Sequence, residues 1–240
     1  MIVEGINCAI ECLKANYPIE KIIISMDRTE KIDEIVNLAK TKNLPVEKVK
    51  KQDLDKITRS EHHQGVISFV KKYEYFEISD ILNFAKEKDE EPFILILDGI
   101  SDPHNLGALI RTAECLGVHG VVIPENRACE VNETVFKTSA GAVANMRVAQ
   151  VVNLSQTIEK LKKLNIWCYA LEAGEQYLTN TNLTGAIALV VGSEGKGVSR
   201  LVRKTCDGTL SIPLKGAINS LNASNAGAIA MYEVLRQRTK

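Results

Sequence analysis

The sequence predicts an α/β protein, with a C-terminal domain built on a parallel sheet and a smaller α/β domain before it. From Phe93 onward, apolar strand-like runs alternate with helical patterns, which is typical of a parallel sheet with helical crossovers. The first of these runs, Phe93–Leu97 (FILIL), is apolar throughout, as expected of a strand covered on both faces. Residues 73–92 carry seven acidic and two basic side chains, and this change in composition indicates a junction.

The part of the chain before the junction predicts a small α/β unit. Apolar residues recur at helical spacing in Glu30–Lys42, and KIIIS at Lys21–Ser25 is a candidate buried strand. The full prediction is helices at Ile6–Ala15, Glu30–Lys42 and Leu54–Ile57, and strands at Lys21–Ser25, Val46–Val49 and Gly65–Val70. His62 and His63 are expected to be solvated loop histidines, with a functional role as the alternative.

The junction itself predicts one short helix. Ser79 followed by Asp80 is a helix start signal, and Ile81 and Leu82 belong to the apolar face that follows it. We therefore expect a domain at residues 1–73, an acidic linker with a short helix at 74–92, and a second domain at 93–240.

The second domain predicts a regular series of elements. After Phe93–Leu97 we expect strands at Gly120–Ile123, Ile166–Ala170, Ile187–Val191 and Thr209–Ile212, and helices at Asn105–Leu116, Asn132–Ala140, Ser155–Leu164 and Ala223–Arg238.

Composition narrows the class of protein without naming a function. A hydrophobic share of 45% and a charged share of 25% are ordinary for a soluble globular protein. No apolar run approaches the roughly 20 residues of a membrane span, and the N-terminus lacks a signal pattern, so we expect a cytoplasmic location. The 30 basic and 30 acidic residues balance, so net charge gives no argument for nucleic acid binding.

The cysteines do not predict a metal site. Six are scattered along the chain without a CxxC pair, whereas zinc sites use closely spaced Cys or His ligands. Cytosolic thiols stay reduced, so we expect neither a metal nor a disulfide. Cys115 and Cys168 lie in apolar segments and are expected to act as small hydrophobic residues.

Three predicted strand-exit loops are rich in Gly, Asn, Asp and Ser. They are Asp98–Thr112 (DGISDPHNLGALIRT), Gly192–Gly197 (GSEGKG) and Ile212–Asn225 (IPLKGAINSLNASN). Ligands of such sheets bind beyond the carboxyl ends of the strands, so these loops are candidates for a shared site. The second loop lacks both the GxGxxG and the GxxxxGK[ST] spacing, which argues against a common nucleotide loop.

Each loop also has an ordinary interpretation when taken alone. Asn105 could cap the first helix, and Arg111, about two turns further on, could be a surface residue. Glu194 lies between glycines that could form a simple turn.

Taken together, the three loops resemble the three signature motifs of the SpoU/TrmH (SPOUT) family of RNA ribose 2′-O-methyltransferases. The resemblance covers most of residues 93–240 and extends to Leu116–Pro124 (LGVHGVVIP) and Asn165–Glu175 (NIWCYALEAGE). The start of the chain, VEGINCAIECL, is similar to the substrate-binding domain of the RlmB-like subgroup, which methylates a guanosine of large-subunit (23S) ribosomal RNA. The third motif reads SLNAS at Ser220–Ser224, where relatives often read SLNVS.

The resemblance implies S-adenosylmethionine as the cofactor and a deep trefoil knot in the C-terminal domain. It implies that Gly192, Ile212 and Leu221 hold the cofactor through backbone groups and apolar contacts. The surrounding residues Leu171–Ala173, Gly195 and Pro213–Leu214 are expected to complete the pocket. For Ile212 and Leu221, a plain core position is the alternative.

The implied reaction is attack of a ribose 2′-oxygen on the methyl group of the cofactor, which requires proton removal and stabilisation of the oxyanion. Arg111, Asn105, Glu194 and Asn222 match the polar motif residues of the family. Arg111 could act as the base or, because arginine stays protonated, could hold the oxyanion or a phosphate. Glu194 could orient Arg111 by a charge-assisted pair, and Asn222 could bond the neighbouring loops.

The family also implies partners. Relatives are homodimers in which the C-terminal helix contributes to the interface. The N-terminal domain resembles RNA-binding modules of ribosomal proteins, and Lys48, Lys50, Lys51 and Arg59 could contact RNA phosphates. Methylation of tRNA or of another rRNA site is the alternative, and a non-catalytic RNA-binding or ribosome-assembly protein is an alternative of another class.

Overall fold

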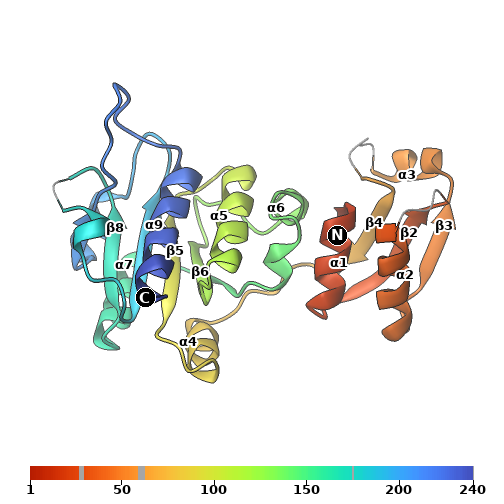
Figure 1. Ribbon diagram of the computed structural model, residues 1–240, viewed down its shortest axis with the longest axis horizontal. Helices are drawn as coiled ribbons and strands as arrows, with labels where there is room; N and C mark the ends of the chain where they lie inside the picture. The colour runs from red at the N-terminus through yellow and green to blue at the C-terminus, as the bar shows by residue number, and fades with distance from the viewer. Residues whose placement is uncertain (27–29, 59–62, 175, 240) are drawn as a thin grey trace. The chain divides into compact units, whose positions relative to one another are not determined.

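The computed structural model describes residues 1–26, 30–58, 63–174 and 176–239 (Figure 1). The chain forms two compact units. The first contains Met1–Glu74 and Val131–Asn145, and the second contains Tyr75–Glu130 and Met146–Lys240. The first unit thus includes a segment that lies far along the sequence, within the range assigned to the second domain. The domain bounds inferred from the sequence stay a prediction.

The first unit is built on a mixed sheet with the strand order β1-β4-β2-β3. Its strands are β1 (Ile2–Glu4), β2 (Ile19–Ser25), β3 (Val46–Val49) and β4 (Val66–Val70), and its helices from this part of the chain are α1 (Ile6–Lys14), α2 (Glu30–Thr41) and α3 (Lys51–Thr58). Strand β4 is antiparallel to β1 and β2, whereas β2 and β3 are parallel. The three-residue strand β1 was not predicted, because it is too short to show a period.

The later segment of the first unit packs against α1 and its surroundings. It contains α6 (Glu133–Thr138) and the 3₁₀ turn η1 (Ala142–Ala144). Phe136 is fully buried, and its ring centroid lies 5.2 Å from that of Tyr17. Lys137 forms an ion pair with Glu4 at 2.6 Å. The buried aromatic contact and the ion pair together hold this segment in the first unit.

His63 differs from the prediction, because its side chain is fully buried. Its Nε2 lies 2.8 Å from the Asp55 carboxylate, and its Nδ1 accepts a hydrogen bond from the Gly65 N–H at 2.9 Å. Both ring nitrogens therefore have hydrogen-bond partners, which offset the desolvation cost of burying a polar ring. The expectation of a solvated residue was wrong for His63, and His62 lies outside the described residues.

The second unit is built on a parallel sheet with the strand order β10-β8-β9-β5-β6-β7. The strands are β5 (Phe93–Asp98), β6 (Gly120–Pro124), β7 (Val148–Val151), β8 (Trp167–Leu171), β9 (Ile187–Gly192) and β10 (Gly208–Leu210). Every pairing in this sheet is parallel, as the apolar run of β5 predicted. The α/β class with a parallel-sheet domain is confirmed, and the trefoil knot stays a prediction.

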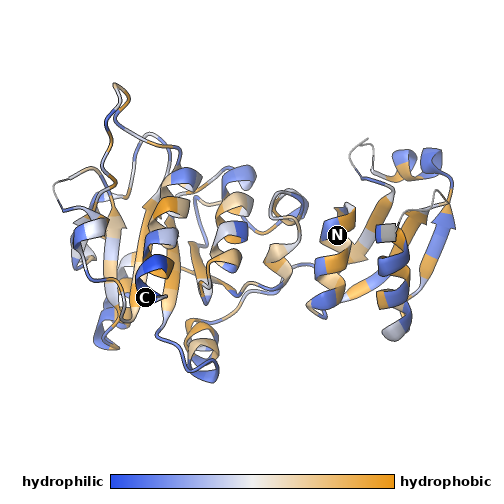
Figure 2. Cartoon of the chain, viewed as in Figure 1, coloured by the Kyte–Doolittle hydropathy of each residue, from blue (hydrophilic) through white to orange (hydrophobic). Residues whose placement is uncertain are grey.

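Helices cover both faces of this sheet. They are α4 (Ile78–Glu87), α5 (Pro103–Cys115), α7 (Leu154–Lys163), α8 (Arg200–Thr205) and α9 (Ala223–Arg238), with the 3₁₀ turn η2 (Leu178–Asn180). One core cluster joins α4, α7 and α8 to residues such as Ile94 and Ile96. On the other face α9 packs on α5, and Gly227 lies against Leu109 and Val191. Figure 2 shows the hydrophobic residues concentrated in the strands between these helices.

Helix α5 begins two residues earlier than predicted. Helix α5 begins at Pro103, and Asp102 is its N-cap, accepting a hydrogen bond from the His104 N–H at 2.9 Å. Proline at the first helical position and aspartate before it are both favoured there. Asn105 is thus inside the first turn, and its expected capping role was wrong.

Helix α9 runs the full length of the sheet and is fixed at both ends. At its C-terminal end the Arg238 guanidinium donates to the backbone carbonyls of Glu91 (2.9 Å), Pro92 (3.1 Å) and Gly185 (2.7 Å). Those carbonyls precede β5 and β9, at the amino ends of the strands. The N-terminal end of α9, at Asn222, therefore lies at the carboxyl ends of the strands, where the loops are.

None of the helices among the described residues is long and apolar enough to cross a membrane.

Helix α4 is expected to be an integral part of the second unit rather than a free linker. Ile81 is fully buried, and a Cβ placed on Gly120 of β6 would lie 2.4 Å from its Cδ1. Ile81→Ala should lower the free energy of unfolding by about 2–5 kcal/mol, because it leaves a cavity in the core. Val152→Ala, at a side chain that is 77% exposed, is the control. Chemical denaturation measures both, and equal midpoints would show that α4 does not support this core.

Candidate active site

The three polar loops meet at one edge of the second unit's sheet. Strand β9 lies between β5 and β8, and β10 pairs with β8, so all of their carboxyl ends point the same way. The loop after β5 leads into α5, the loop after β9 contains Ser193–Val198, and the loop after β10 leads into α9. A ligand bound at the carboxyl ends of these parallel strands, the place predicted from the sequence, could therefore contact all three loops.

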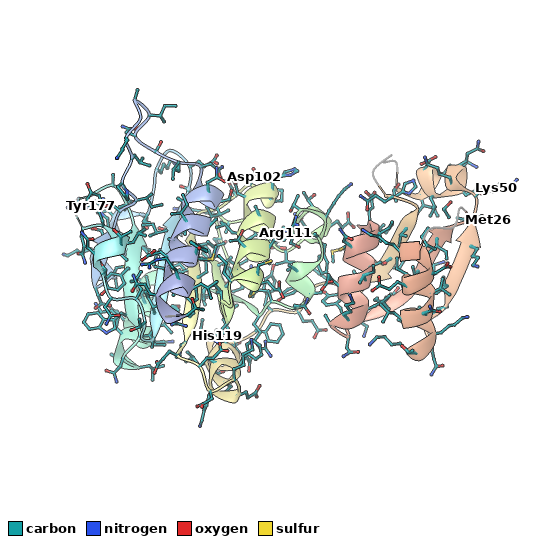
Figure 3. All side chains as sticks on the ribbon, viewed as in Figure 1. Met26, Lys50, Asp102, Arg111, His119 and Tyr177 are labelled. Atoms are coloured by element: carbon teal, nitrogen blue, oxygen red, sulfur yellow. The ribbon has the colours of Figure 1, made fainter. Side chains whose placement is uncertain are left out.

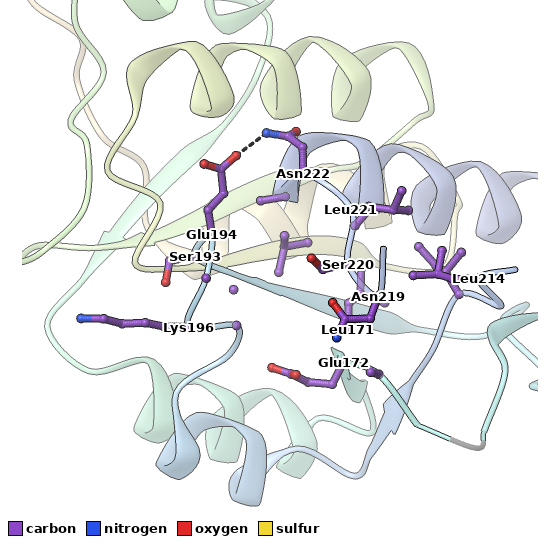
Figure 4. Close-up of a pocket in the computed structure, with 18 of the residues that line it drawn as sticks. Leu171, Glu172, Ser193, Glu194, Lys196, Leu214, Asn219, Ser220, Leu221 and Asn222 are labelled. Atoms are coloured by element: carbon purple, nitrogen blue, oxygen red, sulfur yellow. Dashed lines mark hydrogen bonds between the residues drawn. The ribbon is translucent and has the colours of Figure 1, made fainter. Parts of the chain in front are cut away.

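Three of the polar residues singled out in the sequence form one hydrogen-bonded cluster. The Asn105 Nδ2 donates to the Glu194 Oε1 at 3.1 Å, and the Asn222 Nδ2 donates to the Asn105 Oδ1 at 3.1 Å. The Asn222 Nδ2 also donates to the Glu194 Oε1, as Figure 4 shows. One residue from each loop thus contributes to the cluster, which links the N-terminal ends of α5 and α9 to the loop after β9.

Asn222 has a fixed orientation because both ends of its amide are used. Its Oδ1 is the N-cap acceptor of α9, taking hydrogen bonds from the backbone N–H groups of Ser224 at 2.9 Å and Asn225 at 3.3 Å. The Nδ2 is then directed toward Asn105 and Glu194. The asparagines of the third loop therefore serve helix capping and the polar cluster at the same time.

Arg111 does not join this cluster. It lies on α5 below the N-cap Asp102 and is exposed (Figure 3), and its side chain forms no ion pair or hydrogen bond with any residue in the described part of the chain. Arg111 is six residues beyond Asn105, a rise of about 9 Å along a helix. The possible Glu194–Arg111 pair is not formed, and the two amides both donate to the Oε1 of Glu194.

A cavity of about 650 Å³ lies beside the cluster. Its volume falls within the range typical of small-molecule sites. All six residues predicted to hold a cofactor line it, namely Leu171, Gly192, Gly195, Ile212, Leu214 and Leu221. Glu194 and Asn222 line it as well, so the polar cluster faces the same space (Figure 4).

The cavity also includes polar residues to which sequence reasoning gave no individual role. They are Glu172, Ser193, Lys196, Asn219 and Ser220. Asn219 and Ser220 were noted as polar members of the third loop, but no separate role was assigned to them. Glu172 directly follows β8 and belongs to the segment Leu171–Ala173 that was expected to complete the pocket, but its carboxylate was given no role of its own.

The loop after β9 owes its path to two glycines. A Cβ on Gly192 would lie 2.0 Å from the Gly197 carbonyl carbon, so the loop backbone packs directly on the end of β9. Gly197 has a φ of +64°, and a Cβ there would lie 2.5 Å from the Glu172 Oε1. Gly192 thus shapes the cavity through the loop it supports.

The described residues provide neither a cluster of metal ligands nor a reactive thiol at Cys168. No group of three or more His, Cys, Asp or Glu residues among those the structure describes could hold a metal ion. Cys168 is buried, and burial raises the pKa of its thiol to about 12, so it is not a nucleophile near neutral pH. Cys115, which was expected to behave as a core residue, is exposed.

Comparisons with known proteins agree with this geometry. Residues 92–232 match the model of the SpoU rRNA Methylase family, and residues 2–76 match the model described as RNA 2′-O ribose methyltransferase substrate binding. YacO of Bacillus subtilis, assigned to the TrmH family tRNA/rRNA methyltransferases, is 41% identical over 98% of this chain and 95% of its own length. A Staphylococcus aureus protein with the same assignment is 40% identical over 99% of this chain and 96% of its own.

Solved structures show the same fold. The SpoU methyltransferase AviRb from Streptomyces viridochromogenes, solved in complex with AdoMet, has a TM-score of 0.82 and 22% identity, covering 100% of this chain and 90% of its own. An RNA methyltransferase of the TrmH family from Porphyromonas gingivalis has a TM-score of 0.78 and 25% identity, covering 98% and 89%. At the identity of AviRb, the likeness shows the fold alone.

Gly192→Ala should distort the loop after β9, since the added Cβ would meet backbone atoms that cannot move aside. We expect a loss of about 1–3 kcal/mol in the free energy of unfolding, the usual range for overpacking. Gly185→Ala is the matched control, because a Cβ at Gly185 would meet nothing within 4 Å. Thermal unfolding compares the two, and a Gly192→Ala variant as stable as the control would contradict the close packing described here.

Proposed function

Because the chain belongs to the SpoU rRNA methylase family and is an RNA ribose 2′-O-methyltransferase, we propose that it methylates a guanosine ribose of large-subunit (23S) ribosomal RNA. The observation that carries the catalytic part of this proposal is the cluster of Asn105, Glu194 and Asn222 beside a cavity of about 650 Å³. The rRNA part is supported by the match of residues 2–76 to a substrate-binding model and by the resemblance of the chain's start to the 23S-specific subgroup.

The cofactor is S-adenosylmethionine, and the residues of the cavity fit it. Leu171, Ile212, Leu214 and Leu221 offer apolar surface for a nucleoside and its aliphatic chain, and the glycine-rich loop offers backbone groups at short range. S-adenosylmethionine supplies an electrophilic methyl group on a positively charged sulfur.

The protein's own residues then have to prepare the ribose 2′-hydroxyl. The hydroxyl must lose its proton as the new oxygen–carbon bond forms, and charge develops on its oxygen. Glu194 and Asn222 line the cavity and are held together with Asn105 by hydrogen bonds, so they form a fixed polar wall of the site. Because these polar groups are already ordered, they do not have to reorganise when the RNA binds and reacts.

Arg111 is assigned to the RNA side of the reaction. Because it is exposed and forms no ion pair with the described residues, its guanidinium is free to bind a phosphate or the developing 2′-oxyanion. Proton abstraction by Arg111 is the alternative, and it requires a strongly perturbed arginine.

The remaining parts of the proposal concern partners. Lys48, Lys50 and Lys51 are exposed on the first unit and could contact RNA phosphates, whereas Arg59 lies outside the described residues. We further propose a homodimer formed through α9, on which Ile229 (43%) and Tyr232 (58%) are exposed. A monomer mass by light scattering at assay concentrations would contradict the dimer. An rRNA substrate places the protein in the cytoplasm.

The substrate is tested with purified protein, labelled S-adenosylmethionine and RNA lacking ribose methylation. We expect one 2′-O-methylguanosine in 23S rRNA, mapped by its resistance to alkaline cleavage. Transfer to tRNA, or to a different rRNA position, would overturn the 23S guanosine assignment and leave the chemistry intact. No transfer to any RNA, together with no cofactor binding by calorimetry, would instead indicate a non-catalytic RNA-binding protein.

Arg111→Ala should lower kcat by at least about 100-fold, in line with the loss of an oxyanion-stabilising group, and should leave the Kd of the cofactor within about twofold. The residue does not line the cavity, so cofactor binding has no reason to change. Arg127→Ala, at an exposed arginine on the loop after β6, is the control for loss of a positive charge. Full activity of Arg111→Ala would remove this residue from the site.

A further inference from the structure

Glu172 is an acidic residue of the cavity to which no role has been given. It directly follows β8, and its backbone N–H donates to the Leu210 carbonyl of β10 at 3.0 Å. Its side chain is half-buried and lines the cavity. The position of Glu172 is therefore fixed by the sheet rather than by a mobile loop.

One oxygen of the Glu172 carboxylate is already committed to the protein. The Oε1 accepts a hydrogen bond from the Val198 N–H at 2.6 Å. It also lies close enough to Gly197 that any Cβ there would clash. This contact fastens the loop after β9 and, in return, sets the direction of the carboxylate.

The other oxygen has no such partner. Among the described residues, no hydrogen bond reaches the Oε2 of Glu172. Leu171, Leu210 and Ile212 line the cavity near the end of β8 and offer no donor, and the cavity donors Lys196, Asn219 and Ser220 make no hydrogen bond to this oxygen. An oriented carboxylate oxygen beside apolar surface is a ready acceptor for a hydroxyl or amino group of a ligand.

The position of Glu172 within the cavity indicates which ligand group it meets. Figure 4 shows Glu172 and Glu194 on opposite sides of the pocket. The reacting methyl group has to lie near the cluster of Glu194 and Asn222, so the Glu172 side faces either the nucleoside or the amino acid part. The apolar residues Leu171, Leu210 and Ile212 beside Glu172 favour the nucleoside. Carboxylates at strand exits of parallel sheets commonly accept hydrogen bonds from ribose hydroxyls.

We infer that Glu172 is a specificity-determining residue for the cofactor, accepting a hydrogen bond from a hydroxyl of its ribose. The inference rests on the proposed function, because it assumes that the cavity binds S-adenosylmethionine. It assigns two tasks to one carboxylate: the Oε1 fastens the loop after β9, and the Oε2 selects a ribonucleoside.

The test measures how much each protein depends on the ribose hydroxyls of its ligand. Calorimetry gives the Kd of S-adenosylhomocysteine and of its 2′-deoxy and 3′-deoxy forms for wild type, Glu172→Gln and Glu172→Ala. For wild type, at least one deoxy form should bind about 10-fold more weakly or worse, as expected for a lost hydrogen bond to a charged group. The difference in Kd between the deoxy form and S-adenosylhomocysteine should be smaller in Glu172→Gln and nearly absent in Glu172→Ala.

The ratio of the Kd of a deoxy form to the Kd of S-adenosylhomocysteine separates recognition of the ribose hydroxyl from a general disturbance of the pocket. Glu172→Gln keeps an oxygen for the Val198 N–H, so its thermal unfolding without ligand should match wild type. A purely structural role would weaken all three ligands equally and leave the ratio unchanged, and that result would overturn the inference. Glu159→Gln, at an exposed glutamate of α7 outside the cavity, is the matched control for loss of a negative charge.

Two more ligands exclude other partners for the same oxygen. If Glu172 instead served the charged sulfur, Glu172→Gln would weaken S-adenosylmethionine more than S-adenosylhomocysteine. If it served the amino acid part, 5′-methylthioadenosine would bind wild type and variant equally. Either result would overturn the ribose assignment. Failure of wild type to bind any of these ligands would count against the proposed function itself.

Discussion

The site depends on the side chain of Asn222, which joins helix α9 to two other segments of the chain. Its Oδ1 accepts the N-terminal N–H groups of α9, and its Nδ2 donates to Asn105 of α5 and Glu194 of the loop after β9. An amide is suited to this, because it carries an acceptor and a donor on opposite sides of one planar group. A carboxylate at this position could cap the helix but could not donate to Glu194.

The sheet makes this junction possible. Parallel strands bring the exits of β5, β9, β8 and β10 to one edge, and α9 runs along β8 and β9 to reach it. Arg238 holds the far end of α9 against the amino ends of β5 and β9. The loop after β9 is then shaped by close packing at Gly192 and fastened by Glu172 on one side, while Asp98 accepts the Ser199 N–H at 2.7 Å on the other. Few of these constraints involve the polar residues that first draw attention in the sequence.

Sequence reasoning succeeded where the signal is local or periodic. The apolar run at Phe93–Leu97 predicted a buried parallel strand, and the long helix at Ala223–Arg238 was predicted with the bounds that the structure has. The motif loops predicted which residues line the cavity, whereas the catalytic and binding roles given to those residues stay predictions. Sequence reasoning failed where the burial or the packing of a residue depends on partners that are distant in the sequence. Burial of His63 requires Asp55 and Gly65 as neighbours, and inclusion of Val131–Asn145 in the first unit requires contacts such as Phe136 on Tyr17. Glu172 was expected only as part of the pocket lining, because the Val198 N–H that orients its carboxylate is 26 residues away in the sequence.

The central claim is that the cavity between the loops after β9 and β10 binds S-adenosylmethionine with its reacting end beside Asn222 and Glu194. A crystal structure of the protein with S-adenosylhomocysteine tests this most directly. The account predicts ligand density against Gly192, Ile212 and Leu221, with the sulfur on the side of the cavity nearer Asn222 and the nucleoside nearer Glu172. Density at any other place on the chain, or a ligand bound with its two ends exchanged, would contradict it.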